Sequence, residues 1–167
     1  MQLFKKIILL NLLICILSPS IAYASDLNQE RALYESYIVD ICGDYPIDPN
    51  ILIALVEKES CFKSNAVSEN GKHKGLTQLT PKLFKDRMDE LGLEDSVDPY
   101  SNLMLCADYI YSKVSEGNDI ELVLMMWNMG EDKAKASYSK GHVSSYAKHI
   151  MKRASELGGD TDGSKEE

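Results

Sequence analysis

The sequence predicts a mainly helical α+β fold with one domain, for three reasons. Apolar residues recur at helical spacing along most of the 167-residue chain. Aspartate–proline pairs stand where two of these helical stretches begin, and glycines stand where several of them end. The length and the hydrophobic fraction of 44% suit one domain with its own core and are small for two.

The first two predicted helices are residues 27–41 and a helix that opens at Asp48-Pro49. The first carries its apolar residues on one stripe, and Gly43 ends it. In the second, the aspartate is the N-cap and the proline is the first helical residue. The unbroken apolar run of residues 51–56 predicts that this helix is buried on nearly all sides.

A loop and a third helix come next. Residues 61–74 are polar, and a short β-hairpin near residues 67–79 is weakly indicated. Thr80-Pro81 begins the third predicted helix, and Gly92 ends it.

The rest of the chain predicts three more helices and a tail. One helix begins at Asp98-Pro99 and stops at Gly117, a second covers residues 119–128, and the last covers residues 144–157. Residues 158–167 are polar, and we expect them to form a flexible tail.

Residues 1–24 are typical of a secretory signal peptide. Two lysines precede an apolar run over residues 7–17, and Ala22-Tyr23-Ala24 is a small-residue cleavage site. We therefore expect an exported protein, in the periplasm or cell-wall space, whose folded domain is residues 25–157. The cysteines of the mature chain would then lie in an oxidising compartment.

The charge of the chain excludes some partners. Lys and Arg number 18 and Asp and Glu number 26, which makes the net charge −8. Such an acidic chain lacks the overall basic character of a nucleic-acid-binding protein and the basic stripe of a peripheral membrane protein. The three histidines form no cluster with ligand spacing, so we expect neither a metal nor a cofactor.

One carboxylate stands in an apolar setting. The helical neighbours of Glu59 at three, four and seven positions are Leu52, Leu55, Val56 and Phe62. Burial and the negative end of the helix dipole both raise the pKa of a carboxyl group placed there. A carboxylic acid that stays neutral near pH 7 is what a general acid requires.

Periodicity alone leaves two other interpretations of Glu59. The carboxylate is either exposed at a frayed helix end or paired with Lys63, one turn further on. Glu57 falls on a different face of the same helix, and we expect it to be an ordinary structural acid.

Several short motifs follow one another in a fixed order. They are Glu59-Ser60-Cys61-Phe62, Ala66-Val67-Ser68, Gly75-Leu76-Thr77-Gln78, Asp98-Pro99 with Asn102, Trp127-Asn128-Met129-Gly130, and a late Tyr146. Together they resemble the soluble lytic transglycosylase (SLT) domain of the lysozyme-like superfamily. The resemblance covers residues 47–150.

The resemblance implies an enzyme that cleaves the β-1,4 bond between N-acetylmuramic acid and N-acetylglucosamine in peptidoglycan. Glu59 matches the catalytic acid/base of the family. The positions that match or replace residues lining the sugar groove are Ser68, Gln78, Trp127, Asn128 and Tyr146. Without the family pattern, the same residues would be interpreted as turn formers, surface residues or core.

Two departures from the family pattern affect substrate positioning. Thr77 replaces the usual methionine, and we expect one apolar groove contact to be polar here. Trp127 replaces a tyrosine, which keeps an aromatic face for a sugar ring and loses a hydroxyl.

The mechanism implied by the resemblance uses one acid. Most glycosidases use two carboxylates, and the sequence offers no clear partner for Glu59. The 2-acetamido group of the substrate would stabilise C1, and the C6 hydroxyl would then close a 1,6-anhydro ring. No metal or cofactor takes part.

The sequence leaves two alternatives open. One is a hydrolytic muramidase on the same fold, and the other is a non-catalytic wall-binding or assembly protein. The small size suggests a monomer that opens the wall locally for a secretion, pilus or conjugation apparatus.

The mature chain keeps Cys42, Cys61 and Cys106, and we expect one disulfide. If the first two helices form a hairpin, Cys42 lies about 20 Å from Cys61, which is too far for a bridge. Cys61 and Cys106 replace residues that are usually small in the family, on helices that should pack together. They are therefore the predicted pair.

Overall fold

The computed structural model describes residues 27–159, so the predicted signal peptide and residues 160–167 lie outside the described residues. The chain separates into two units, Met1–Tyr34 and Glu35–Glu167. In the first unit the described residues, 27–34, are helical. The second unit contains helices α2 to α7 and the site residues predicted from the sequence.

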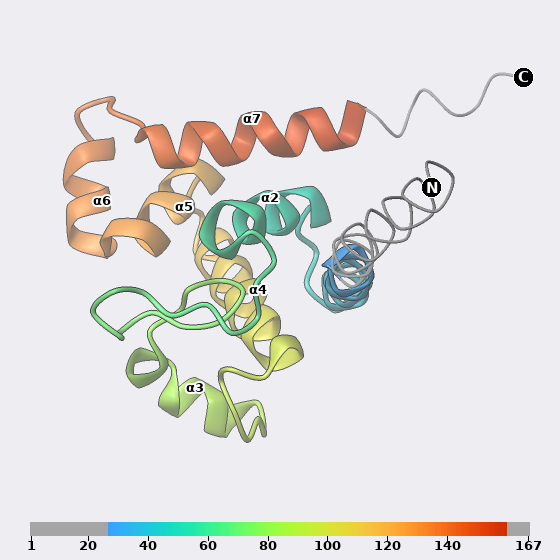
Figure 1. The fold of residues 1–167 in the computed structure, drawn as a ribbon. Coiled ribbons are helices and arrows are strands. Elements are labelled where there is room, and N and C mark those ends of the chain that lie inside the picture. Colours follow the sequence, from blue (N-terminus) through green and yellow to red (C-terminus); the bar gives the residue numbers. More distant parts are fainter. Residues whose placement is uncertain (1–26, 160–167) are drawn as a thin grey trace, which may run out of the picture. The chain divides into compact units, whose positions relative to one another are not determined.

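The second unit is almost entirely helical, which confirms the predicted fold class (Figure 1). The only β-pairing among the described residues consists of isolated antiparallel bridges from Lys74 to Val67 and Leu79. After a helical segment that ends at residue 44, its elements are α2 (Pro49–Ser60), η1 (Pro81–Leu83), α3 (Lys85–Glu90), α4 (Pro99–Ser115), α5 (Ile120–Met129), α6 (Glu131–Tyr138) and α7 (Ser145–Gly159).

Both aspartate–proline pairs begin helices as predicted. The Asp48 carboxylate accepts a hydrogen bond from the backbone N–H of Asn50 at 2.9 Å at the start of α2. Asp98 does the same for the backbone N–H of Ser101 at 3.0 Å at the start of α4. In each case an otherwise unpaired N–H of the first turn is satisfied, which stabilises the helix by about 1 kcal/mol.

Two segments differ from the prediction. The third predicted helix is divided into η1 and α3 at Phe84, whose backbone (φ −107°, ψ 5°) departs from helical geometry. Residues 131–138, for which the sequence predicts no helix, form α6. This helix buries only Ala134, so it carries no apolar stripe that the sequence could reveal.

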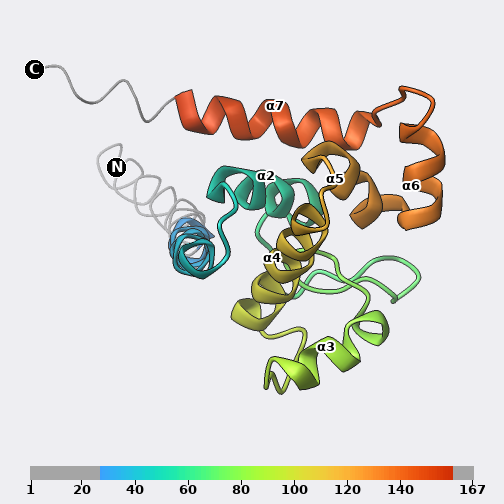
Figure 2. The ribbon, with the colours of Figure 1, turned by 180° about the vertical axis from the view of Figure 1, so that it is seen from behind.

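The core is built around α2, which packs against α7, while α5 packs against α4, α6 and α7. Figures 1 and 2 show α7 at one end of the unit and α3 at the other, with α2 and α4 between them. Burial of each large apolar side chain contributes about 1.5–3 kcal/mol. The largest fully buried residues are Ile38, Ile41, Leu52, Leu55, Leu76, Leu79, Leu103, Leu105, Ile110, Leu124, Met125 and Ile150.

A buried asparagine anchors the loop before η1 to α4. The side chain of Asn102 is fully buried, and its Oδ1 accepts hydrogen bonds from the backbone N–H and the hydroxyl of Thr77, both at 2.9 Å. Its Nδ2 donates to the carbonyls of Lys74 at 3.3 Å and Ser96 at 2.8 Å. Because a buried amide must satisfy all its polar atoms, this arrangement fixes the loop in one conformation.

The expectation that Thr77 makes a polar contact in the groove is wrong. Thr77 is fully buried, and its hydroxyl donates to Asn102 instead of facing a ligand.

No helix among residues 27–159 is both long and apolar enough to cross a membrane.

The close packing of Gly75 against the anchoring side chain of Asn102 predicts that Gly75→Ala strongly destabilises the fold. Gly75 has φ +78°, and a Cβ atom there would lie 2.5 Å from Nδ2 of Asn102. We expect the free energy of unfolding in urea to fall by about 2 kcal/mol or more, from backbone strain and steric overlap together. Gly71→Ala is the matched control, because Gly71 has φ +70° and nothing within 4 Å, so that strain alone applies. Equal losses in the two variants would contradict the anchor.

Candidate active site

Glu59 lies in the last turn of α2, with its carboxyl group half-buried. The four apolar neighbours expected from helical spacing, Leu52, Leu55, Val56 and Phe62, are all buried. Beyond the helix the chain turns sharply, because Cys61 and Phe62 both adopt left-handed conformations (φ 50° and 63°).

The carboxyl group of Glu59 accepts a hydrogen bond from a hydroxyl near the other end of the chain. Tyr146, in the first turn of α7, donates its phenolic hydrogen to Oε1 of Glu59 at an oxygen–oxygen distance of 2.5 Å. The packing of α2 against α7 brings these residues together although 87 positions separate them. The hydrogen bond occupies one carboxyl oxygen.

Burial raises the pKa of Glu59 above its ordinary value. The hydroxyl of Tyr146 and the nearby charges of His73 and Lys58 oppose this effect by lowering the pKa of Glu59, and burial outweighs them. Burial, followed by the charge of Glu59, raises the pKa of Tyr146, so its hydroxyl remains a donor. The site therefore holds an acid that resists ionisation beside a phenol that stays protonated.

Glu57 faces a different partner. Its Oε2 lies 2.9 Å from Nε of Arg153, two turns along α7 from Tyr146. This ion pair compensates the charge of Glu57 and gives α2 and α7 a second polar contact. Glu57 is thus held by a cation, whereas Glu59 is held by a neutral hydroxyl.

Ser68 lies in a tight turn at the tip of the loop. Its hydroxyl donates to Oδ1 of Asn70 at 2.9 Å and accepts from the backbone N–H of His73 at 3.0 Å. The backbone N–H of Ser68 donates to the carbonyl of His73 at 3.0 Å. The structure therefore gives Ser68 a part in shaping the turn that presents His73.

Gln78 closes the base of the same loop. Its backbone is left-handed (φ 51°), and its Nε2 donates to the carbonyls of Ala66 at 3.1 Å and Gly75 at 3.0 Å. These bonds commit the amide nitrogen to the loop, and the residue lines the adjoining pocket.

The pocket has a volume of about 720 Å³, and three aromatic side chains form one of its walls. The ring centroid of Trp127 lies 5.5 Å from that of Phe84 and 5.3 Å from that of Tyr109. Nε1 of Trp127 donates to the carbonyl of Thr77 at 3.2 Å, which ties α5 to the loop. Asn128, the next residue, is exposed and also lines the pocket.

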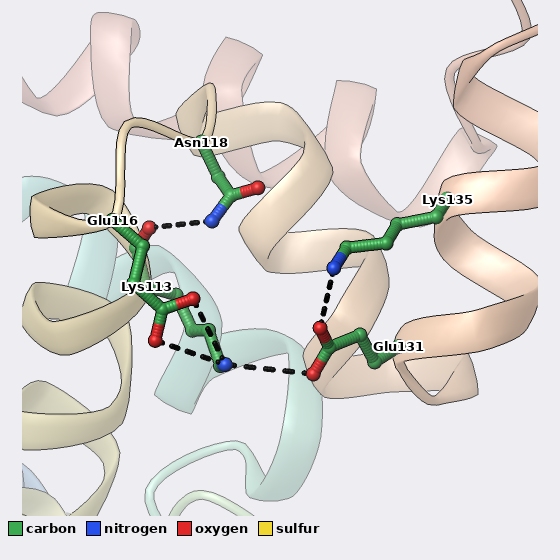
Figure 3. Close-up of polar contacts among 5 residues, drawn as sticks. All are labelled: Lys113, Glu116, Asn118, Glu131 and Lys135. Carbon is green, nitrogen blue, oxygen red and sulfur yellow. Dashed lines mark hydrogen bonds and ion pairs between the residues drawn. The ribbon is translucent and has the colours of Figure 1, made fainter.

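The carboxylates that line this pocket are paired with cations. Asp108 is buried and receives hydrogen bonds from Arg87 at 2.7 and 2.5 Å. Glu131 lies 2.6 Å from Lys135 and 3.4 Å from Lys113 (Figure 3). Lys113 also contacts Glu116, and the backbone carbonyl of Lys113 accepts a hydrogen bond from Asn118 at 2.8 Å. This network of ion pairs therefore joins the end of α4 to α6.

The predicted site residues thus fall into three groups. Glu59 and Tyr146 are in direct contact, while Gln78, Trp127 and Asn128 line the pocket. Ser68 is in the loop turn, and the lining of this pocket includes neither Ser68 nor Glu59 nor Tyr146.

The sequence does not single out two contributors to the site, His73 and Tyr109. His73 lines the pocket and influences Glu59 electrostatically. Tyr109 joins the aromatic wall and lies on the apolar stripe of α4, where helical spacing alone indicates a core residue.

The predicted Cys61–Cys106 disulfide is not formed. Among the described residues Cys42, Cys61 and Cys106 are free, and Cys61 is exposed whereas Cys106 is fully buried. The left-handed conformation at the end of α2 accompanies the exposure of Cys61, while Cys106 lies on the core face of α4. Burial raises the pKa of Cys42 to about 11 and raises the pKa of Cys106 as well.

Comparison with known proteins supplies a family and a fold. Residues 36–150 match the family model described as the transglycosylase SLT domain. A solved structure of an inactive mutant of the lytic transglycosylase Slt from Pseudomonas aeruginosa is similar, with a TM-score of 0.65 and 20% sequence identity. The match covers 76% of this chain and 24% of that one, so this chain corresponds to about a quarter of that protein.

The contact between Tyr146 and Glu59 predicts a measurable change in the pKa of Glu59. A hydrogen bond donated to a carboxylate stabilises the charged form, so Tyr146→Phe should raise the pKa of Glu59 further. Carboxyl ¹³C NMR titration should give a value above the ordinary ~4.3 in the wild type and a higher one in the variant. Tyr138→Phe, which removes a hydroxyl bound to Asp119, should leave Glu59 unchanged. An unchanged or lower value in Tyr146→Phe would disprove the assigned role.

Proposed function

Because the chain belongs to the transglycosylase SLT domain family, we propose that it is a lytic transglycosylase that cleaves the β-1,4 bond between N-acetylmuramic acid and N-acetylglucosamine in peptidoglycan. The observation that carries the proposal is the contact between Glu59 and Tyr146. The acid of raised pKa is not among the residues that line the pocket of about 720 Å³ with its aromatic wall, but His73, which lines that pocket, lies near enough to affect the pKa of Glu59. An apolar, partly aromatic cleft with a few polar groups is typical of a ligand site.

In the first step Glu59 acts as a general acid. It transfers its proton to the glycosidic oxygen as the bond from that oxygen to C1 of the muramic acid breaks. The 2-acetamido oxygen of the same sugar attacks C1 and takes up the positive charge that develops there. Loss of the proton converts Glu59 to a carboxylate, which the hydroxyl of Tyr146 stabilises by hydrogen bonding.

In the second step the carboxylate of Glu59 acts as a general base. It removes the proton of the muramic C6 hydroxyl, whose oxygen attacks C1 and displaces the acetamido oxygen. The product carries a 1,6-anhydro ring, and Glu59 is protonated again. No water is consumed, and the substrate supplies the nucleophile that a second carboxylate supplies in most glycosidases.

The surroundings of Glu59 favour this single-acid scheme. Glu57, the nearest acid in the sequence, is held by Arg153. The pocket carboxylates Asp108 and Glu131 are likewise paired with cations.

Each pocket residue makes a different contact with the substrate. The exposed part of Trp127 stacks on a sugar face, Asn128 provides an amide, and Gln78 offers its remaining amide oxygen. Ser68 acts on the substrate by holding the loop turn. Tyr146 orients the acid.

We further propose that residues 1–24 direct export and are removed after Ala24, so that the enzyme acts in the periplasm or cell-wall space as a monomer. A small exported domain of this kind suits local opening of the wall for a secretion, pilus or conjugation apparatus. Size and family resemblance are the support for this role.

Glu59→Gln tests the assignment of the acid. The amide keeps the size of the side chain and still accepts from Tyr146, but it has no proton to transfer. Turnover of purified peptidoglycan should fall by about 10²–10⁴-fold or more. Glu57→Gln, two residues away, is the matched control and should keep most of the activity. Full activity in Glu59→Gln would exclude a catalytic role for this residue.

The same variant should not lose stability at neutral pH. Because the pKa of Glu59 is raised in the folded protein, the folded state binds more protons than the unfolded state above the ordinary pKa. The wild type therefore loses stability as the pH rises through that range, and the amide variant avoids this loss. If Glu59→Gln melts at the same temperature as the wild type or a higher one, its loss of activity is due to the missing proton and not to unfolding.

A further inference from the structure

His73 links the acid to the aromatic pocket. It lines the pocket, whereas neither Glu59 nor Tyr146 does. Its charge also lowers the pKa of Glu59, and no other described residue of the pocket lining is among the groups that shift this pKa. Because electrostatic effects fall off with distance, this places His73 at the end of the pocket nearest the acid. A glycan with sugars in the pocket and its reacting bond at Glu59 therefore runs past His73.

The backbone of His73 is fixed by the turn at the tip of the loop. Its N–H donates to Oγ of Ser68 at 3.0 Å, and its carbonyl accepts from the backbone N–H of Ser68, also at 3.0 Å. The next residue, Lys74, forms an antiparallel bridge with Leu79, and the backbone N–H of Lys74 donates to the carbonyl of Leu79 at 2.9 Å. Bonds on both sides of the loop thus leave the backbone at His73 little freedom.

The imidazole ring is held at one of its two nitrogens. Nδ1 of His73 lies 3.1 Å from Oγ1 of Thr80, which also lines the pocket. Because a hydroxyl both donates and accepts, either neutral tautomer of the ring satisfies this bond. Nε2 has no hydrogen-bond partner among residues 27–159, and His73 is exposed. The ring is therefore anchored to the loop while Nε2 stays open to a ligand.

The charged side chains elsewhere in the pocket lining are committed to one another or to neighbouring lysines. Asp108 is paired with Arg87, and Glu131 is paired with two lysines (Figure 3). The amide nitrogen of Gln78 is bound to two carbonyls of the loop. His73 forms no ion pair within the described part of the chain. Its second ring nitrogen is thus available for a sugar where these groups are already engaged.

We propose that Nε2 of His73 forms a hydrogen bond with a polar group of the sugar that lies where the glycan passes from the pocket to Glu59. His73 is then a substrate-binding residue that fixes the position of the sugar chain relative to the acid. One neutral hydrogen bond of this kind changes an affinity by about two- to tenfold. The inference rests on the proposed function for its choice of ligand, but it concerns binding and not the chemical step.

The test measures binding without turnover. The Glu59→Gln variant is titrated with the β-1,4-linked tetramer of N-acetylglucosamine, and calorimetry gives the dissociation constant. Adding His73→Asn should weaken binding by about two- to tenfold, because the shorter amide keeps a polar group for Thr80 near the position of Nδ1 and has none at the position of Nε2. Adding His73→Gln should keep most of the affinity, because the longer amide places a polar group near the position of Nε2. His142→Gln is the matched control, since His142 is exposed and absent from the pocket lining, and should leave the affinity unchanged.

Ring-nitrogen NMR separates a direct contact from a role in holding the loop. The chain contains three histidines, so the ¹⁵N signals of the His73 ring are identified by their loss in His73→Asn. When the tetramer is added to Glu59→Gln, we expect the Nε2 signal of His73 to move further than its Nδ1 signal. The ring signals of His142 and His149 should stay in place. Loosening of the loop by a substitution would not produce this pattern in a protein that retains His73.

Three results would overturn the proposal. They are an unchanged affinity in His73→Asn, ring signals of His73 that the tetramer does not move, and weaker binding by His73→Gln than by His73→Asn, which would assign the effect to the bond with Thr80. The proposed function is decided separately by the turnover of peptidoglycan by the wild type. Cleavage with an unmoved His73 ring would retain the enzyme and reject the contact, whereas a moved ring without cleavage would retain the contact and reject the enzyme.

Discussion

The packing of the end of α2 against the first turns of α7 is the contact on which the site depends. It places a carboxyl group among apolar side chains, where the hydroxyl of Tyr146 donates a hydrogen bond to it at 2.5 Å. Two turns further along α7, Arg153 binds Glu57 and fixes the register of the same two helices. The same two helices thus pair Glu57 with a cation and hold Glu59 among apolar side chains, where burial raises the pKa of Glu59.

The aromatic pocket depends on a second constraint, the attachment of the loop to α4 and α5. Asn102 satisfies four polar groups with one buried amide, and Trp127 holds the carbonyl of Thr77. Gly75 is required there because a Cβ atom at this position would overlap the amide of Asn102. The departure from the family at Thr77 therefore adds a buried hydrogen bond to the anchor and does not alter the groove surface.

The sequence predicts most of the helices and the apolar surroundings of Glu59, because helix caps and apolar spacing are local signals. Asp48, Asp98 and the neighbours of Glu59 behave as their spacing indicates. Polar helix α6 lacks such a signal. Contacts that join distant segments, such as Trp127 with Thr77, have no local signature either, and the pairing predicted for Cys61 fails because its side chain faces solvent.

The central claim is that a lone acid and a substrate hydroxyl together cleave the glycan, and the mass of the products tests it most directly. Purified peptidoglycan is digested with the wild-type protein, and the released muropeptides are analysed by mass spectrometry without prior reduction. The account predicts 1,6-anhydro ends, each one water lighter than the product of hydrolysis. Muropeptides with free reducing ends would contradict it and indicate a muramidase, and undigested glycan would indicate a wall-binding protein without activity.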